Sequence, residues 1–468
     1  MDFWPWFIGF IVAVGAYALW SIWKVHAHPA QILLGQAASM NWVAAGVVKK
    51  DGYIEHRYIG KARKYNTVVM LFFLGQVFGL SSVAYAQNED SELRRVVGQK
   101  IVVGFFGRKN TDPDFRRVIK NLEQGLVGGV LFLGRNISNK DDLELMVREV
   151  KNCKCDVLPL IAIDEEGGII ERLGEPQGFK HTASAAEVGR GDEEKARADY
   201  ERLAKKLSDI GFNMNLAPVV DLNLNPENPI IGRLDRSFSS SPMAVSLYAS
   251  IFIEEQHKRG IATVLKHFPG HGSSSNDSHD SIANVETSWS PVELVPYQNL
   301  IEMHIVDCIL VGHLSNAPLW GGAATQYGAR AIKQILRQQL KFGGVVLSDD
   351  LSMKAVRSSA QPFSEVIRSS VRAGVDIVIV SRINDDDENA DIGAYANSAI
   401  LEGIRTGEID LEAVNSSVRR IEFLKKEISD EAPGDLTERT AGFGLSRNHR
   451  SAPRIDNRAV QIVGRGWI

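Results

Sequence analysis

Eight short apolar runs, separated by polar stretches that are compatible with helices, are the feature that most constrains how this chain folds beyond residue 90. Each run is apolar almost throughout, which is typical of strands buried on both faces of a parallel sheet. The runs cover residues 100–106, 128–133, 158–164, 214–221, 262–268, 308–313, 343–349 and 375–381. Strands that alternate with helices in this way predict an α/β fold, namely a (β/α)8 barrel over residues 91–428. A doubly wound open sheet is the alternative.

One of the polar intervals, residues 193–211, shows the expected helical pattern clearly. Leu203, Leu207 and Ile210 share one face of a helix with 3.6 residues per turn. Gly211 follows them and can end the helix, because glycine tolerates the left-handed conformation that often follows a last turn. The interval therefore predicts an amphipathic helix that packs against the sheet.

Charged residues stand where these predicted strands end. They are Asp164, Asp221, Lys266 with His267, His313 and Asp349. The carboxyl ends of barrel strands meet at one rim, which is where active sites of such barrels lie. A single aspartate at a strand end often only caps the next helix or turn. Five ends that carry charge or imidazole favour a functional site instead.

Residues 266–281, KHFPGHGSSSNDSHDS, concentrate groups that could bind a metal ion or transfer protons. Possible metal ligands are His267, His271, Asp277, His279 and Asp280. None of them has the helical spacing of a zinc motif, and Pro269, Gly270 and Gly272 interrupt any helix between the first two histidines. The composition favours a loop that projects Asp277 and His279 over the barrel mouth, where the carboxylate orients the imidazole. A solvated surface loop and a metal site remain the alternatives.

The first ninety residues form a different kind of sequence. No charged residue occurs over residues 3–23 or 67–86, and both runs are long enough to span a bilayer. Basic residues precede the second run, and Ala84 and Ala86 form an A-x-A pattern typical of signal cleavage sites. Region 1–90 is therefore predicted to be a membrane or signal segment. Buried core helices, or a start site placed too far upstream, are the alternatives.

The charges around these two runs predict an orientation. Lys and Arg residues lie between the runs, whereas acidic residues follow the second one. The positive-inside rule then places the middle segment in the cytoplasm and the chain after about residue 87 outside it. Without cleavage the protein would be membrane-anchored, and with cleavage after Ala86 it would be secreted to the periplasm. The tail over residues 429–468 is rich in Arg, Gly and Pro and is predicted to be poorly ordered or to lie across the surface.

Overall composition excludes several partners. The 53 Lys and Arg residues are nearly balanced by 57 Asp and Glu residues, so the chain has no basic excess suited to nucleic acid. It contains no dinucleotide fingerprint, P-loop or zinc-finger spacing, so no nucleotide cofactor or structural metal is expected. Cys153, Cys155 and Cys308 are predicted to be unpaired thiols, in preference to metal ligands or redox groups.

Several of these segments resemble one family. KHFPGHG (266–272) is followed by DSH (277–279), and the chain also contains IDEEGGIIERL (163–173), DRSF (235–238) and GVVLSDDLSM (344–353). In this order they resemble family 3 glycoside hydrolases, within the single-domain β-N-acetylglucosaminidase branch. The resemblance extends from about residue 95 to about residue 428.

This resemblance implies a retaining exo-β-N-acetylglucosaminidase that needs no metal or other cofactor. Asp349 matches the nucleophile, His279 the acid/base and Asp277 the group that orients it. Asp164 would bind sugar hydroxyls, and the groups implied to hold the ring are Arg172, Arg236, Lys266 and His267. His271 and His313 would have supporting roles and Asp350 a secondary one. A salt bridge without a substrate role is the alternative for the two arginines.

The implied substrate is terminal β-linked N-acetylglucosamine, often in peptidoglycan fragments that carry anhydro-muramic acid. The segments DSIANVET (280–287) and ATQYGAR (324–330) depart from the family pattern, so contacts to the leaving group are expected to differ. Two alternatives share the sequence features. Because a histidine does not repel phosphate, the enzyme could be a phosphorylase, or the chain could be a membrane-anchored glycan-binding protein without catalysis.

Overall fold

The structure is a computed structural model that describes residues 90–276, 282–323, 328–357, 361–381 and 390–429. The chain divides into two units, Met1–Tyr85 and Ala86–Ile468, and all described residues belong to the second. The predicted membrane or signal runs, the cleavage site after Ala86 and nearly all of the predicted tail lie outside the described residues. Among the residues that are described, no helix is both long enough and apolar enough to cross a membrane.

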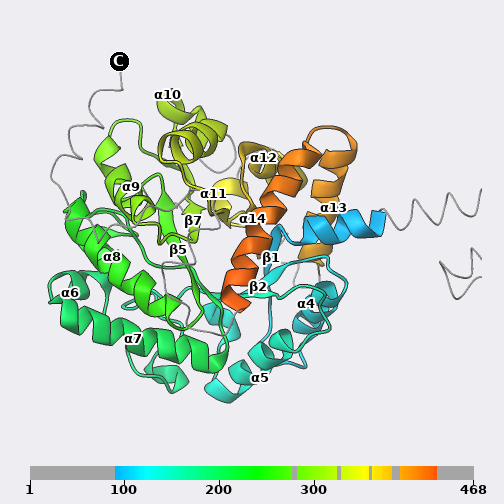
Figure 1. Cartoon of the computed structure of the whole chain (residues 1–468), viewed down its shortest axis with the longest axis horizontal. Coiled ribbons are helices and arrows are strands. Elements are labelled where there is room, and N and C mark those ends of the chain that lie inside the picture. Colours follow the sequence, from blue (N-terminus) through cyan, green and yellow to red (C-terminus); the bar gives the residue numbers. More distant parts are fainter. Residues whose placement is uncertain (1–89, 277–281, 324–327, 358–360, 382–389, 430–468) are drawn as a thin grey trace, which may run out of the picture. The chain divides into compact units, whose positions relative to one another are not determined.

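All eight predicted strands form, and they close into a parallel barrel (Figure 1). They are β1 (Ile101–Gly104), β2 (Gly129–Phe132), β3 (Leu160–Ile163), β4 (Met214–Asn215), β5 (Ala262–Phe268), β7 (Cys308–Val311), β10 (Val345–Asp350) and β11 (Ile377–Val380). Each strand pairs with its neighbour along the chain, and β1 pairs with β11 to complete the ring. The predicted barrel is confirmed and the open sheet is excluded.

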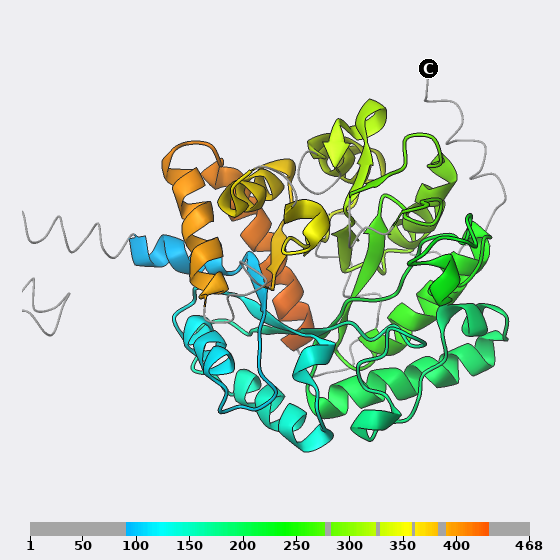
Figure 2. The ribbon, with the colours of Figure 1, turned by 180° about the vertical axis from the view of Figure 1, so that it is seen from behind.

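Helices surround the strands, as Figures 1 and 2 show from opposite sides. The α-helices are α4 (Pro113–Glu123), α5 (Lys140–Lys151), α6 (Ala185–Gly189), α7 (Glu193–Ile210), α8 (Pro242–His257), α9 (Val295–Glu302), α10 (Ala317–Trp320), α11 (Lys354–Arg357), α12 (Phe363–Ala373), α13 (Ile392–Arg405) and α14 (Leu411–Ser429). A π-helix, η5, covers Arg330–Gln339, and short 3-10 turns are η1 (Gly134–Asn136), η2 (Glu175–Gln177), η3 (Gly232–Leu234) and η4 (Pro291–Leu294). A small second sheet joins β6 (Ala283–Asn284), β8 (Leu314–Asn316) and β9 (Gly322–Ala323).

Helix α7 confirms the helix predicted for residues 193–211. Its first turn is capped by the Asp192 side chain, which accepts a hydrogen bond from the Lys195 backbone N–H at 2.8 Å. Gly211 ends it with a φ of 109°, in the left-handed region that favours glycine. The predicted apolar face, which includes Leu203 and Leu207, is buried.

Strand β4 is shorter than the apolar run that predicts it. The ladder covers only Met214–Asn215, and Pro218 follows within the same run. Proline has no backbone N–H, so it cannot donate to a sheet ladder. Beyond it the chain stays beside β5 through an isolated bridge between Val219 and Lys266, which keeps the end of the run at the barrel rim.

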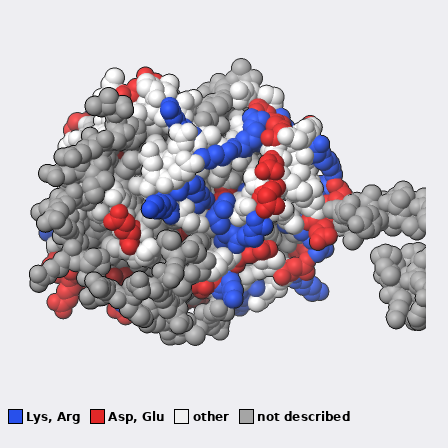
Figure 3. Space-filling view, turned by 45° about the horizontal axis from the view of Figure 1, so that its top comes forward, with Lys and Arg blue, Asp and Glu red and all other residues white. Residues whose placement is uncertain are grey.

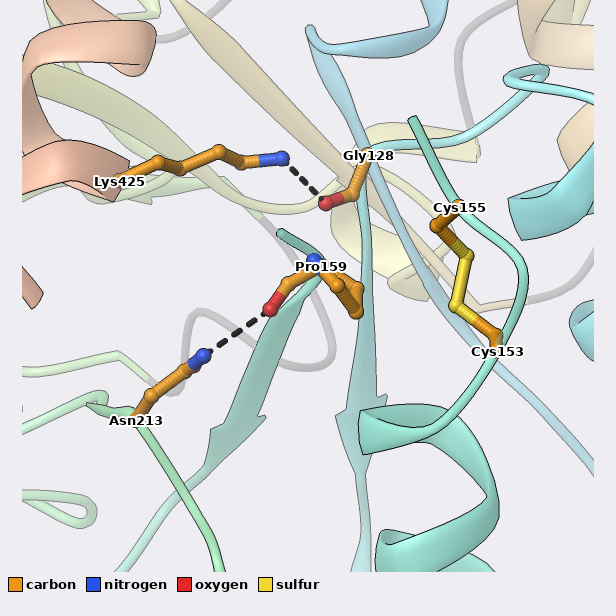
Figure 4. Close-up of a disulfide and its surroundings, with 6 residues drawn as sticks. All are labelled: Gly128, Cys153, Cys155, Pro159, Asn213 and Lys425. Atoms are coloured by element: carbon orange, nitrogen blue, oxygen red, sulfur yellow. Dashed lines mark hydrogen bonds between the residues drawn. A yellow bond between two sulfur atoms is a disulfide. The ribbon is translucent and has the colours of Figure 1, made fainter. Parts of the chain in front are cut away.

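Helix α14 covers the amino-terminal end of the barrel. Ile421 and Leu424 of this helix belong to the same buried cluster as the residues inside the barrel, including Val102 and Met214. Lys425 donates to the carbonyl oxygen of Gly128, just before β2, at 2.8 Å (Figure 4). Because α14 occupies the amino ends of the strands, the opposite rim is left for a ligand.

The segment between α5 and β3 corrects one prediction. Cys153 and Cys155 form a disulfide there (Figure 4), so the prediction of unpaired thiols is wrong at these two positions. Their Cα atoms lie 5.4 Å apart, within the range that a disulfide requires, because the chain turns after α5. The sequence alone did not show this turn. Cys308, on β7, is a free and buried cysteine as predicted.

Charges on the surface are mixed in sign. Figure 3 shows basic and acidic side chains lying close to one another on the face that it presents. This arrangement agrees with the near balance of charge in the sequence, where acidic residues exceed basic ones slightly.

Candidate active site

A cavity of about 220 Å³ opens at the carboxyl ends of the barrel strands. Its polar lining consists of Asp164, Glu166, Arg172, Arg236, Lys266, His267, Asp349 and Asp350. Its apolar lining consists of Leu131, Leu133, Ile170, Leu216, Ile230, Leu310, Met353 and Ile379. The strand ends of β3, β5 and β10 thus bring together residues that are up to about 200 positions apart in the sequence. Six of the ten predicted site residues lie on this one cavity.

Four charged groups form a buried network on one side of the cavity. Lys266 Nζ lies 2.8 Å from Asp164 Oδ1 and 2.7 Å from Glu166 Oε1. Arg236 binds Glu166 through two parallel hydrogen bonds of 2.8 Å, which is the strongest geometry for this pair. Two cations and two anions therefore balance within the network, and neither the lysine nor the arginine is left uncompensated.

The neighbouring charges decide the ionisation of this network. Burial favours the neutral acid at Glu166, but Arg236 and Lys266 outweigh it and hold the pKa of Glu166 well below its ordinary value. Burial would likewise lower the pKa of Lys266, yet Asp164 and Glu166 raise it. Glu166 and Lys266 consequently stay charged around neutral pH, and the network presents charged hydrogen-bonding groups to the cavity.

Asp221 fixes the orientation of His267. Its carboxylate lies 2.7 Å from Nδ1 of the imidazole and also accepts a hydrogen bond from the backbone N–H of His271 at 2.8 Å. Burial would raise the pKa of Asp221, but His267 outweighs it and the net direction is downward. An ionised carboxylate only accepts hydrogen bonds, so Nδ1 carries the proton. The strand-end pattern singled out Asp221, and the structure gives it this orienting contact.

The consecutive residues Asp349 and Asp350 have different surroundings at the end of β10. Both reach the cavity. The Asp350 carboxylate accepts hydrogen bonds from the backbone N–H groups of Ser352, at 2.9 Å, and Ser381, at 3.2 Å. Burial raises the pKa of Asp350 in spite of these bonds. Asp350 therefore has a role in holding the loop after β10, whereas the Asp349 carboxylate accepts a hydrogen bond from the backbone N–H of Asp350, its neighbour in the same strand, at 2.8 Å.

His271 and His313 are buried but do not belong to the cavity lining within the described part of the chain. His271 Nδ1 lies 2.6 Å from Ser274 Oγ, and burial together with His267 lowers the pKa of His271 to about 4. His313 Nε2 donates to the backbone carbonyl oxygen of Asp350 at 3.1 Å. Asp277 and His279 lie outside the described residues.

Glu166 is the polar residue of the cavity that the sequence analysis missed. It lies two residues beyond Asp164 in the same strand-end segment, and this closeness to a strand end is the signal that could have identified it. The apolar lining was missed as well: Ile230 belongs to a connecting segment without a strand pattern, and Ile170 lies within the segment 163–173 but carries no charge that would single it out.

Two further cavities lie elsewhere. One of about 300 Å³ is lined by α5, α7 and residues 178–182, outside the barrel, and one of about 160 Å³ lies near Gly128 and Cys155. Neither is at the carboxyl ends of the strands, where the charged residues gather. Among the described residues, no group of three or more histidine, cysteine, aspartate or glutamate side chains is placed to hold a metal ion.

Comparison with known proteins adds a family to this geometry. A family model described as the glycosyl hydrolase family 3 N-terminal domain matches residues 93–424. A beta-hexosaminidase of Photobacterium profundum is 32% identical over 269 residues, which are 55% of this chain and 76% of that protein. The beta-hexosaminidase LpqI of Mycobacterium tuberculosis is 32% identical over 343 residues, which are 71% of this chain and 82% of the relative.

Solved structures agree with the barrel architecture. A glycoside hydrolase family 3 beta-N-acetylglucosaminidase from Paenibacillus has a TM-score of 0.65 and 27% identity, over 79% of this chain and 67% of its own. The structure of LpqI from Mycobacterium tuberculosis has a TM-score of 0.61 and 28% identity, over 71% and 93% of the two chains.

Proposed function

The chain belongs to glycosyl hydrolase family 3 and is a glycosidase, and from this premise we propose that it is a retaining exo-β-N-acetylglucosaminidase. The observation that carries the proposal is the cavity at the barrel rim, where Asp349 faces a charged network built from Lys266, Arg236, Asp164 and Glu166. The name beta-hexosaminidase of the relatives supports the choice of N-acetylhexosamine as the sugar.

In the proposed first step, Asp349 attacks the anomeric carbon of the terminal sugar. A new bond forms between its carboxylate oxygen and that carbon while the glycosidic bond breaks, which gives a covalent glycosyl-enzyme. In the second step water attacks the same carbon and releases the carboxylate. Two inversions in succession retain the β configuration.

His279, oriented by Asp277, is proposed to move the proton in both steps. It would donate to the departing oxygen in the first step and accept a proton from the attacking water in the second. An imidazole with a reference pKa of about 6.5 is able to serve both directions near neutral pH. Asp277 and His279 both lie outside the described residues. Support for this assignment therefore comes from the sequence, namely from the DSH segment (277–279).

The charged network is proposed to bind the sugar hydroxyls. Asp164 accepts hydrogen bonds, Lys266 donates them, and Arg172 and His267 complete the ring of polar contacts around the cavity. Charge-assisted hydrogen bonds are stronger than neutral ones, so they suit a ligand whose surface is largely hydroxyl groups. Arg236 donates to Glu166 through Nε and Nη2 and to the Ile230 carbonyl oxygen through Nη1, so we assign it mainly to holding Glu166 in place.

The natural substrate is proposed to be a peptidoglycan fragment that ends in β-linked N-acetylglucosamine, acted on outside the cytoplasm. Support comes from the two uncharged runs of region 1–90 and the charges that flank them. In this proposal the N-terminal region either anchors the barrel to the membrane or directs its secretion to the periplasm.

One assay of the purified full chain tests the function. We expect turnover of an aryl β-N-acetylglucosaminide in preference to the matching β-glucoside, with the β anomer of the free sugar as the first product. Asp349→Ala should abolish turnover, and a fluorosugar inhibitor should become bonded to Asp349. A sugar phosphate formed on addition of phosphate would identify a phosphorylase instead. Sugar binding without turnover would identify a glycan-binding protein.

A further inference from the structure

Another buried carboxylate, Glu293, lies against the loop that leaves β5. It belongs to η4, and only 1% of its surface is exposed. Its carboxylate oxygens accept hydrogen bonds from the backbone N–H of Gly272, at 2.9 Å, and from the hydroxyl of Ser273, at 2.5 Å. Glu293 does not belong to the cavity lining, so the mechanism proposed above gives it no task.

The loop passes Glu293 in close contact. Gly270 has a φ of 120°, and a Cβ atom placed there would lie 2.5 Å from the Cβ of Glu293. A Cβ at Gly272 would lie 1.7 Å from the carbonyl oxygen of Leu222. Glycine at both positions therefore allows the backbone to run between the η4 side chain and the segment that follows β4. The path of residues 270–273 is set by contact on both sides.

The same loop is held from a second element by Asp221, through His267 and the backbone N–H of His271. Further along, the backbone N–H of Ala283 donates to the carbonyl oxygen of His313 at 3.2 Å, where β6 joins β8. Both the beginning and the end of the loop are thus hydrogen-bonded to the barrel. On the β5 side, Asn225 and Asn228 also hold Ser274, at 2.9 and 3.1 Å, and Glu293 is the charged group that holds Gly272 and Ser273 just before it.

We propose that Glu293 is a positioning residue for the acid/base loop: its carboxylate fixes Gly272 and Ser273, and through them the start of the segment that carries Asp277 and His279. The inference rests on the proposed function, because it requires His279 to act as the proton donor. The geometry fits the role, since an ionised carboxylate has acceptor sites for both donors at once.

Ionisation of Glu293 matters to this role. Burial raises its pKa to about 7, and the negative charge of Asp221 acts in the same direction, while the bonds from Ser273 and Gly272 oppose it. The titratable groups that interact with Glu293 are Asp221, on the segment after β4, and Tyr297, on α9. At pH 8 the Glu293 carboxyl is largely ionised and accepts hydrogen bonds from both donors. Experiments at that pH therefore compare an ionised Glu293 with a neutral side chain at the same position.

The test uses the full chain and two aryl β-N-acetylglucosaminides, one with a strongly acidic phenol as leaving group and one with a weakly acidic phenol. Only the weakly acidic phenolate needs a proton as it departs, and kcat/KM reports the step in which it departs. We expect Glu293→Gln to lower kcat/KM at pH 8 about tenfold or more for the second substrate and less than threefold for the first. Glu293→Asp, which keeps the charge, should restore part of the loss. Glu302→Gln, an exposed site on α9, is the matched control and should change neither value.

His279→Ala is measured in parallel to separate the two proposals. If the loss of kcat/KM caused by His279→Ala depends on the leaving group and the loss caused by Glu293→Gln does not, the positioning role is refuted and the proposed function stands. If His279→Ala shows no such dependence, the acid/base assignment itself is refuted. An equal loss by Glu293→Gln on both substrates would mean a merely structural role. Should Glu293→Gln not fold, Ser273→Ala decides the question, with a smaller loss expected on the second substrate only.

Discussion

Removal of the Glu166 carboxylate tests whether the charged residues of the cavity hold one another in place. Glu166 is 6% exposed and is bound by Arg236 and Lys266 at 2.7 to 2.8 Å. Taking away one partner of a buried ion pair usually costs about 3 to 5 kcal/mol, because the remaining charge is left uncompensated in a poorly solvated place. Here two cations lose a partner. We therefore expect Glu166→Ala to lower the free energy of unfolding by about 3 to 5 kcal/mol.

Urea denaturation of the full chain at pH 7 measures this loss, and Glu227→Ala is the matched control. Glu227 also pairs with an arginine, Arg233, but its side chain is 77% exposed. Exposed ion pairs contribute about 0 to 1 kcal/mol because water screens them. A loss with Glu166→Ala no larger than that of the control would refute the claim that this network is held together by its own charges.

The pH dependence gives a second check on Glu166. Arg236 and Lys266 lower its pKa below the ordinary value of 4.5 in spite of burial. A carboxyl whose pKa is lowered by folding contributes stability that is fully present above its unfolded pKa and is lost as the pH falls below it. The difference in unfolding free energy between the wild type and Glu166→Gln should stay constant from pH 8 to about 5 and shrink below about pH 4.5. A difference that grows on acidification would contradict the assignment.

Two further predictions concern the amino-terminal end of the barrel. Burial lowers the pKa of Lys425 from 10.5 to about 7, so the wild type should gain stability relative to Lys425→Met as the pH rises from about 7 to about 10, as followed by urea denaturation at several pH values. The Cys153–Cys155 disulfide closes a loop of only about three residues, so its reduction should lower the unfolding free energy by no more than about 1 to 2 kcal/mol. Thermal unfolding and turnover with and without reductant check this, and turnover should not change.

The sequence predicted the fold well because the relevant pattern is local. Each buried strand appears as a mainly apolar run, and a parallel barrel places the charged residues at the ends of five of these runs at the same rim. The sequence did not predict which charged side chains pair with one another across the barrel. Lys266 pairs with Asp164 and Glu166, about 100 residues earlier, and no pattern along the chain indicates which carboxylate a given lysine meets. The disulfide was missed for the same reason, since the direction of two side chains depends on the turn between them.

Lys266 and Lys425 show how the partners of a buried lysine decide the direction in which its pKa shifts. Both side chains are 3% exposed. Lys425 donates to the neutral oxygens of Gln99 and Gly128, and burial lowers its pKa. Lys266 has two carboxylates within 2.8 Å, and its pKa is raised instead. Burial alone would therefore lower the pKa of Lys266, as it does that of Lys425. It follows that Asp164 and Glu166 keep the Lys266 ammonium charged. Under the proposed function, a neutral residue at position 166 is expected to weaken sugar binding even in a variant that folds, which a binding titration would measure.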